Sequence, residues 1–136
     1  MNIKTIVALI VLTLIFVALF LYFYNQKSQI DDILLTQDTS NTVYDSKVFT
    51  DKSKEIFILI KLSKVKKHEN IRVSWYKKVE NDLLLIQDNN IAIEEDGSGY
   101  IVLSFIHKNE EYENGIYMVD VYFNGKKEKS KEFSIN

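Results

Sequence analysis

The stretch TIVALIVLTLIFVALFLYFY, from Thr5 to Tyr24, decides how the rest of the chain is organised. It carries no charge, and a helix of about 20 residues spans roughly 30 Å, the hydrocarbon thickness of a bilayer. The run is longer than the apolar region of a cleaved signal peptide. It also ends in Tyr22 and Tyr24 rather than in small residues. We therefore expect residues 1–24 to form a cytoplasmic tip and one uncleaved transmembrane helix.

The charges beside the apolar run favour one orientation. Lys4 and the α-amino group precede the run, whereas Lys27 follows it and the next lysine is Lys47. The positive-inside bias then places the N-terminus in the cytoplasm. We expect a single-pass protein of the cell membrane whose C-terminal domain is periplasmic or extracellular.

The length of the chain leaves room for one small domain after the anchor. Of the 17 basic residues only Lys4 precedes the end of the apolar run, so 16 remain against 19 acidic residues, a net charge near −3. Nucleic-acid-binding domains are usually basic, so we expect no nucleic-acid partner. The chain has no cysteine, which excludes both disulfides and an acylated lipoprotein anchor.

Residues 25–42 are polar and are predicted to connect the membrane helix to the domain. Ile30, Ile33 and Leu34 fall at the spacing i, i+3, i+4, which predicts that the helix continues past the membrane. A solvated stalk is the alternative interpretation. The sequence DTSNT, residues 38–42, then predicts a linker.

From Val43 onward the period changes, and apolar residues alternate with polar ones as in half-buried strands. An Asn124-Gly125 pair predicts a two-residue hairpin turn. Lys129 and Lys131 share parity with Phe133, so the last strand must project beyond the core or carry a bulge. The pattern predicts an all-β antiparallel sandwich of about seven strands. Strands are expected near residues 56–62, 71–76, 101–105, 117–123 and 133–135, with weaker candidates at 43–50, 82–87 and 91–95 and a turn at Asn89-Asn90.

Several residues of this region resemble those of immunoglobulin-like domains. The segment ENGIYMV, residues 113–119, resembles the D-x-G-x-Y-x-C segment of strand F, with Val119 at the cysteine position. Trp75 resembles the strand C tryptophan, and Ile60 or Leu62 stands for the strand B cysteine. The resemblance covers residues 43–136. It implies a bacterial immunoglobulin-like β-sandwich with Trp75, Tyr117 and Val119 in its core, Tyr117 being the tyrosine-corner residue.

Candidate catalytic residues are few. His68 and His107 have no neighbouring motif and are interpreted as surface histidines. There is no nucleophile elbow, phosphate loop or His-Glu-x-x-His pattern. We therefore expect no enzyme activity, no catalytic residue, no cofactor and no metal.

Candidate binding residues are basic or aromatic. A basic turn would suit an anionic partner, or would protect a strand edge from pairing with another edge. Outward tyrosines are enriched at recognition surfaces but also cover the outer faces of a sandwich. The residues are Lys64, Lys66, Lys67, Tyr76, Tyr100 and Tyr122.

The predicted function is that of a membrane-anchored extracytoplasmic module that recognises a protein or an envelope component. Its partners would be the membrane, through Thr5 to Tyr24, and a protein. The alternatives are a periplasmic enzyme accessory domain and a pilus-like structural subunit. The resemblance supports the binding module only by analogy of fold.

Overall fold

The computed structural model describes residues 1–40, 42–106 and 110–136, and its first element is a helix. Helix α1 (Ile3–Tyr24) begins at Asn2, whose side chain accepts a hydrogen bond from the Lys4 N–H at 3.1 Å. None of its residues is buried against the rest of the chain. Its mean hydropathy reaches 3.1, so α1 is long and apolar enough to cross a membrane, as predicted. Asn41 of the predicted linker and His107 lie outside the described residues.

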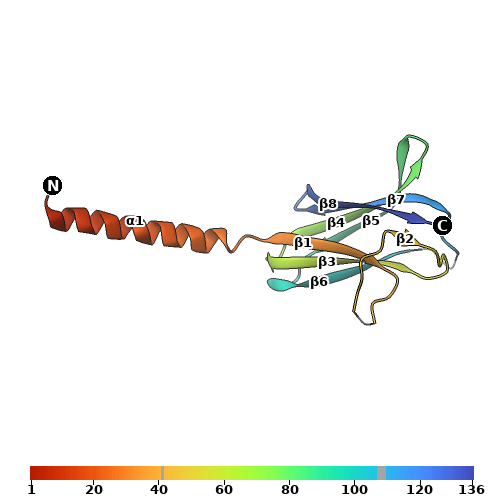
Figure 1. Ribbon diagram of the computed structural model, residues 1–136, viewed down its shortest axis with the longest axis horizontal. Coiled ribbons are helices and arrows are strands. Elements are labelled where there is room, and N and C mark those ends of the chain that lie inside the picture. Colours follow the sequence, from red (N-terminus) through yellow and green to blue (C-terminus); the bar gives the residue numbers. More distant parts are fainter. Residues whose placement is uncertain (41, 107–109) are drawn as a thin grey trace.

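The rest of the described chain is mostly β-structure in two sheets (Figure 1). The smaller sheet has the order β1-β3-β6 and the larger one β2-β8-β7-β4-β5. Strand β2 runs parallel to β8, and the other pairs are antiparallel. The strands are β1 (Gln29–Thr36), β2 (Val48–Phe49), β3 (Ile56–Val65), β4 (Asn70–Val79), β5 (Asp82–Ala92), β6 (Gly97–Phe105), β7 (Gly115–Phe123) and β8 (Lys126–Ile135).

The two sheets share one apolar core around Trp75. The Trp75 ring is 0% exposed and stacks on Phe105 of β6 at a centroid distance of 4.7 Å. Phe133 of β8 meets the same ring edge-on at 6.1 Å. Val119 lies opposite Trp75 on β7, and Tyr117 is buried two residues earlier. The residues expected in the core therefore lie inside, where they join both sheets.

The prediction of a helical connection over residues 25–42 is wrong, because residues 29–36 form strand β1. Ile30, Ile33 and Leu35 are all buried against β3. A bulge between Ile30 and Asp32 inserts one residue and brings Ile30 to the same face as Ile33. That shift produces a three-residue spacing in a strand, which imitates the period of a helix.

Two further local predictions need correction. Residues 82–92 form one strand, because Asn89 and Asn90 pair with β4 instead of turning. The candidate at 43–50 is reduced to the two residues of β2. Both errors have the same cause, since pairing with a neighbouring strand outweighs local turn and strand propensity.

Two turn-level predictions are confirmed. Asn124 and Gly125 have φ values of 49° and 85°, the double positive φ of a type I′ turn. Strand β8 carries a bulge, since Lys129 opposes Val121 while Lys127 opposes Tyr122. The bulge precedes Lys129, so Lys129, Lys131 and Phe133 still share one face, opposite Val121, Val119 and Tyr117.

The position of β1 predicts where the chain can be shortened. A fragment of residues 42–136 loses three buried side chains, each worth about 1.5–3 kcal/mol, from a domain with only about 5–15 kcal/mol of stability. We expect this fragment to be unfolded, with red-shifted Trp75 emission and no β-type circular dichroism. A fragment of residues 26–136 retains β1 and should give blue-shifted emission. A folded 42–136 fragment would show that β1 is dispensable.

Candidate binding surfaces

The six predicted binding residues lie in three separate places. Tyr76 on β4 and Tyr122 on β7 lie close to each other on the outer face of the larger sheet. Tyr100 lies on β6 of the other sheet and is exposed. The basic turn comprises the end of β3 and the residues after it, at the end of the domain that α1 enters, since Gln29 pairs with Ser63. Its members are Lys64, Lys66 and Lys67.

A polar cluster surrounds the two tyrosines. The Arg72 guanidinium lies 4.9 Å from the Tyr122 ring centroid, and its Nε donates to Asp88 Oδ1 at 3.1 Å. Ser74 Oγ, although fully buried, donates to the same Asp88 oxygen at 2.7 Å. Burial, and then the neighbouring Tyr76, raises the pKa of Tyr122. The cluster therefore presents a fixed guanidinium and phenol groups that can form hydrogen bonds.

A second surface is apolar and was missed by the sequence interpretation. Strand β5 is an edge strand, because it pairs only with β4. Its residues 83–86 are 44–58% exposed. Pairing of β4 with β7 stops at Lys77, so the β4–β5 hairpin projects beyond the sheet, as the green hairpin in Figure 1 shows. The sequence did contain a signal for this surface, namely consecutive apolar residues that must fall on both faces of the strand. A strand with only one buried face leaves some of them exposed. The run is Leu83, Leu84, Leu85 and Ile86.

Beside this run lies a hollow of about 480 Å³ with an apolar floor and an acidic rim. Leu84, Ile86 and Ile106 line the floor, and Glu110 and Glu111 line the rim. Nearby, Lys77 and Glu113 form an ion pair. Their hydrogen bond raises the pKa of Lys77 and lowers the pKa of Glu113.

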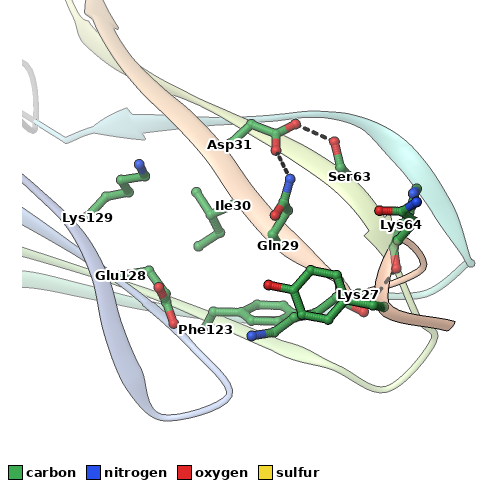
Figure 2. Close-up of a pocket in the computed structure, with 12 residues that line it drawn as sticks. Lys27, Gln29, Ile30, Asp31, Ser63, Lys64, Phe123, Glu128 and Lys129 are labelled. Atoms are coloured by element: carbon green, nitrogen blue, oxygen red, sulfur yellow. Dashed lines mark hydrogen bonds between the residues drawn. The ribbon is translucent and has the colours of Figure 1, made fainter. Parts of the chain in front are cut away.

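A third surface is a cleft of about 710 Å³ between the end of α1 and the β domain (Figure 2). Lys27 and Lys64 lie on one side, and Glu128 and Lys129 lie on the other. Ser63 and Gln29 both donate hydrogen bonds to Asp31. The Ser63 hydrogen bond is the main cause of the lowered pKa of Asp31.

No metal site is visible in residues 1–40, 42–106 and 110–136, where no three His, Cys, Asp or Glu side chains gather. Tyr112 is buried beside Phe105, and its hydroxyl both donates to the Phe105 carbonyl and accepts from the Ile56 N–H. Burial raises the pKa of Tyr112. This tyrosine therefore closes the far end of the core.

Comparison with known proteins finds similarity at the level of solved structures. No protein-family model and no curated protein matches the chain. A solved structure of the alkylpurine DNA glycosylase AlkC from Pseudomonas fluorescens, bound to DNA containing an abasic site analogue, is similar with a TM-score of 0.51. The match has 15% identity and covers 80% of this chain but 30% of the glycosylase. At this identity the similarity concerns the fold alone.

This comparison corrects two predictions. The lack of catalytic motifs predicted that the chain is not an enzyme, and its acidic charge predicted no nucleic-acid partner. The comparison contradicts both exclusions, because a protein with a similar fold is an enzyme bound to DNA, so missing motifs and net charge do not exclude either property for this fold. Short motifs and net charge describe the linear chain. They do not describe the surfaces that folding assembles from distant strands.

Proposed function

We propose that the chain is a single-pass membrane protein whose β domain lies outside the cytoplasm and binds a protein partner. The anchor is α1, a predominantly apolar helix of 22 residues, none of which is buried. The orientation follows from Lys4 on the N-terminal side of the helix. The domain is an immunoglobulin-like sandwich in this proposal.

Three features support the immunoglobulin-like assignment. Trp75 lies buried between two sheets of β1-β3-β6 and β2-β8-β7-β4-β5 order. The Tyr117 hydroxyl donates to the Glu113 carbonyl, four residues upstream, at 2.7 Å. A tyrosine corner makes this kind of contact at the start of strand F. Val119 follows two residues later, opposite Trp75.

The observation that carries the binding function is the exposed apolar run on β5. Natural edge strands are usually short, or are protected by lysine, proline or a covering segment. Strand β8 has several lysines, whereas β5 has none and spans 11 residues. An unprotected edge of this kind binds an extended segment that adds a strand to the sheet.

A second copy in the same membrane does not fit this edge as an antiparallel partner. Helix α1 and the strands share one long axis (Figure 1). Antiparallel pairing of two β5 strands would reverse that axis and point the two helices in opposite directions. An antiparallel partner of β5 is therefore another chain, or a free segment of one.

Charge indicates the chemistry of that segment. Glu80 and Asp82 flank the apolar run at the hairpin tip, and Glu110 and Glu111 border the adjacent hollow. A strand with alternating apolar residues and a flanking lysine or arginine would complement both the run and its acidic border.

A photocrosslinking amino acid at position 84 tests this surface in cells. We expect a discrete adduct at Leu84 and none at Tyr100, which is equally exposed but lies on the other sheet. The double variant Leu83→Lys, Leu85→Lys should reduce the adduct at least about tenfold, as loss of a binding hot spot does. Val102→Lys on exposed β6 is the matched control. Equal adducts at both probe positions, or no effect of the lysines, would contradict the proposal.

The orientation is tested with single cysteines, since the natural chain has none. An Asn81→Cys variant places a thiol at the exposed β4–β5 turn, and Ile3→Cys places one at the N-terminal tip. We expect an impermeant maleimide to label position 81 in intact cells and position 3 only after permeabilisation. The reverse pattern would put the domain inside the cytoplasm.

A second candidate is an accessory domain of an enzyme that handles DNA. The observations favouring it are the fold similarity to a DNA glycosylase and the exposed Arg72 held over Tyr122. An arginine stacked on an aromatic ring can contact both phosphates and bases.

DNA binding by the full chain in detergent tests this second candidate. Fluorescence anisotropy with labelled duplex and single-stranded oligonucleotides should show binding that weakens as salt rises. Arg72→Gln should weaken it several-fold, since one lost contact costs about 1–3 kcal/mol. Lys54→Gln, at the other side of the domain, should not. An unchanged baseline at micromolar protein would reject this candidate.

A further inference from the structure

The cleft between α1 and the β domain lies at the depth of phospholipid headgroups if α1 spans a membrane, so this inference rests on the proposed function. Helix α1 ends at Tyr24, and the Asn25 N–H still donates to the Leu21 carbonyl at 3.0 Å. Strand β1 begins at Gln29, which leaves residues 25–28 between the two elements. Headgroup layers extend only about 5–8 Å beyond each side of the hydrocarbon. The cleft begins within that distance of the apolar span.

The connection that sets this height is held by hydrogen bonds. Ser28 Oγ lies 2.7 Å from Glu69 Oε1 and 2.9 Å from the Lys64 carbonyl, so its hydroxyl donates to one of these acceptors at a time. The Lys27 N–H donates to the Tyr24 carbonyl at 3.3 Å. The β domain is therefore held next to the end of α1 and is not connected to it by a flexible linker.

The charges that line the cleft are unequally satisfied. Asp31 accepts hydrogen bonds from Ser63 and Gln29, and Glu128 lies 4.0 Å from the Lys126 ammonium. In contrast, no ion pair in the described part of the chain engages Lys27, Lys64 or Lys129. Lys129 also acts on the charge of Asp31, but three lysines face two carboxylates, so the lining keeps a net positive charge for an anion.

The backbone holds one of these cations in an uncommon conformation. Lys64 has a φ of 55°, which is rare for a residue with a side chain. It lies in the bulge where β3 loses its register with β6, and its N–H donates to Ser98 Oγ at 2.9 Å. Strain of this kind persists where the surrounding structure imposes it, and it concentrates at binding sites. The conformation places Lys64 on the rim of the cleft opposite Lys129 (Figure 2).

We propose that this cleft binds the phosphate of an anionic membrane phospholipid and thereby seats the β domain on the bilayer. Lys27, Lys64 and Lys129 contact the phosphate oxygens. Tyr24 and Phe123 line the same cleft and offer aromatic surface to the glycerol and the first acyl carbons. The volume of about 710 Å³ suits a headgroup, since ligand sites commonly measure about 300–1,000 Å³. Lys66 and Lys67 of the same turn extend the basic surface along the membrane.

The test uses the full chain in nanodiscs that contain phosphatidylcholine and phosphatidylglycerol, analysed by native mass spectrometry. We expect the released protein to retain one phosphatidylglycerol in preference to phosphatidylcholine. The variant Lys27→Gln, Lys64→Gln, Lys129→Gln should lower this retention at least about tenfold, because a basic residue at an anionic surface contributes about 1 kcal/mol. The matched control is Lys47→Gln, Lys54→Gln, Lys78→Gln, which removes the same charge from exposed lysines at the far end.

Each alternative result is decisive. Equal loss of lipid in both triple variants would mean that only net charge matters, and would overturn the site. Full lipid retention by the Lys27→Gln, Lys64→Gln, Lys129→Gln variant would also overturn the site. Displacement of the lipid by millimolar glycerol phosphate would overturn the lipid assignment in favour of a soluble phosphate ligand. Failure of the chain to enter nanodiscs would instead refute the anchor. Both faces of a nanodisc are accessible, so the orientation of the chain does not affect the result. The proposed β5 partner is absent from the sample, so its binding does not affect the result either.

Discussion

The stacking of Trp75 on Phe105, at 4.7 Å, joins the two sheets, and the remaining structure depends on that contact. Trp75 comes from β4 and Phe105 from the end of β6, so the contact holds the larger sheet against the smaller one. Once Trp75 points inward, the alternation of β4 places Arg72, Ser74 and Tyr76 outward. The polar cluster on the outer face is thus a consequence of core packing. Its buried Ser74 is tolerated because Asp88 accepts its hydrogen bond.

The antiparallel order then separates the turns between two ends of the sandwich. The turn after β3 and the Asn124–Gly125 turn lie at the end next to α1, together with Lys64, Lys66 and Lys129. The β4–β5 turn and the residues 110–113 lie at the other end, with Glu80, Asp82 and other acidic residues. The lysines of the proposed lipid cleft therefore lie at one end, and the acidic residues beside the β5 run lie at the other. Both proposed binding surfaces use this separation.

The two edges of the larger sheet have opposite character. At one edge β8 carries lysines and is partly covered by the short β2, and Lys131 pairs with Asp45. At the other, β5 exposes consecutive leucines without such protection. The edge at β8 and β2 is protected against pairing with a further strand, whereas the edge at β5 is suited to add a strand. This difference is the physical basis of the proposed partner binding.

The sequence alone determined the features that depend on local chemistry. An uncharged run of helix length predicts α1, and the Asn124-Gly125 pair predicts a turn because both residues accept positive φ. The alternation of apolar and polar residues around Trp75 and Val119 predicts strands whose apolar side chains point into the core. Only the tertiary structure decided that residues 29–36 are a strand and that residues 82–92 are one strand instead of two. It also decided that Tyr76 and Tyr122 meet while Tyr100 does not, and that Lys27, Lys64 and Lys129 share a cleft. The reason is that pairing partner, bulge position and register depend on residues far away in the chain, and a one-residue shift in register moves every side chain to the opposite face.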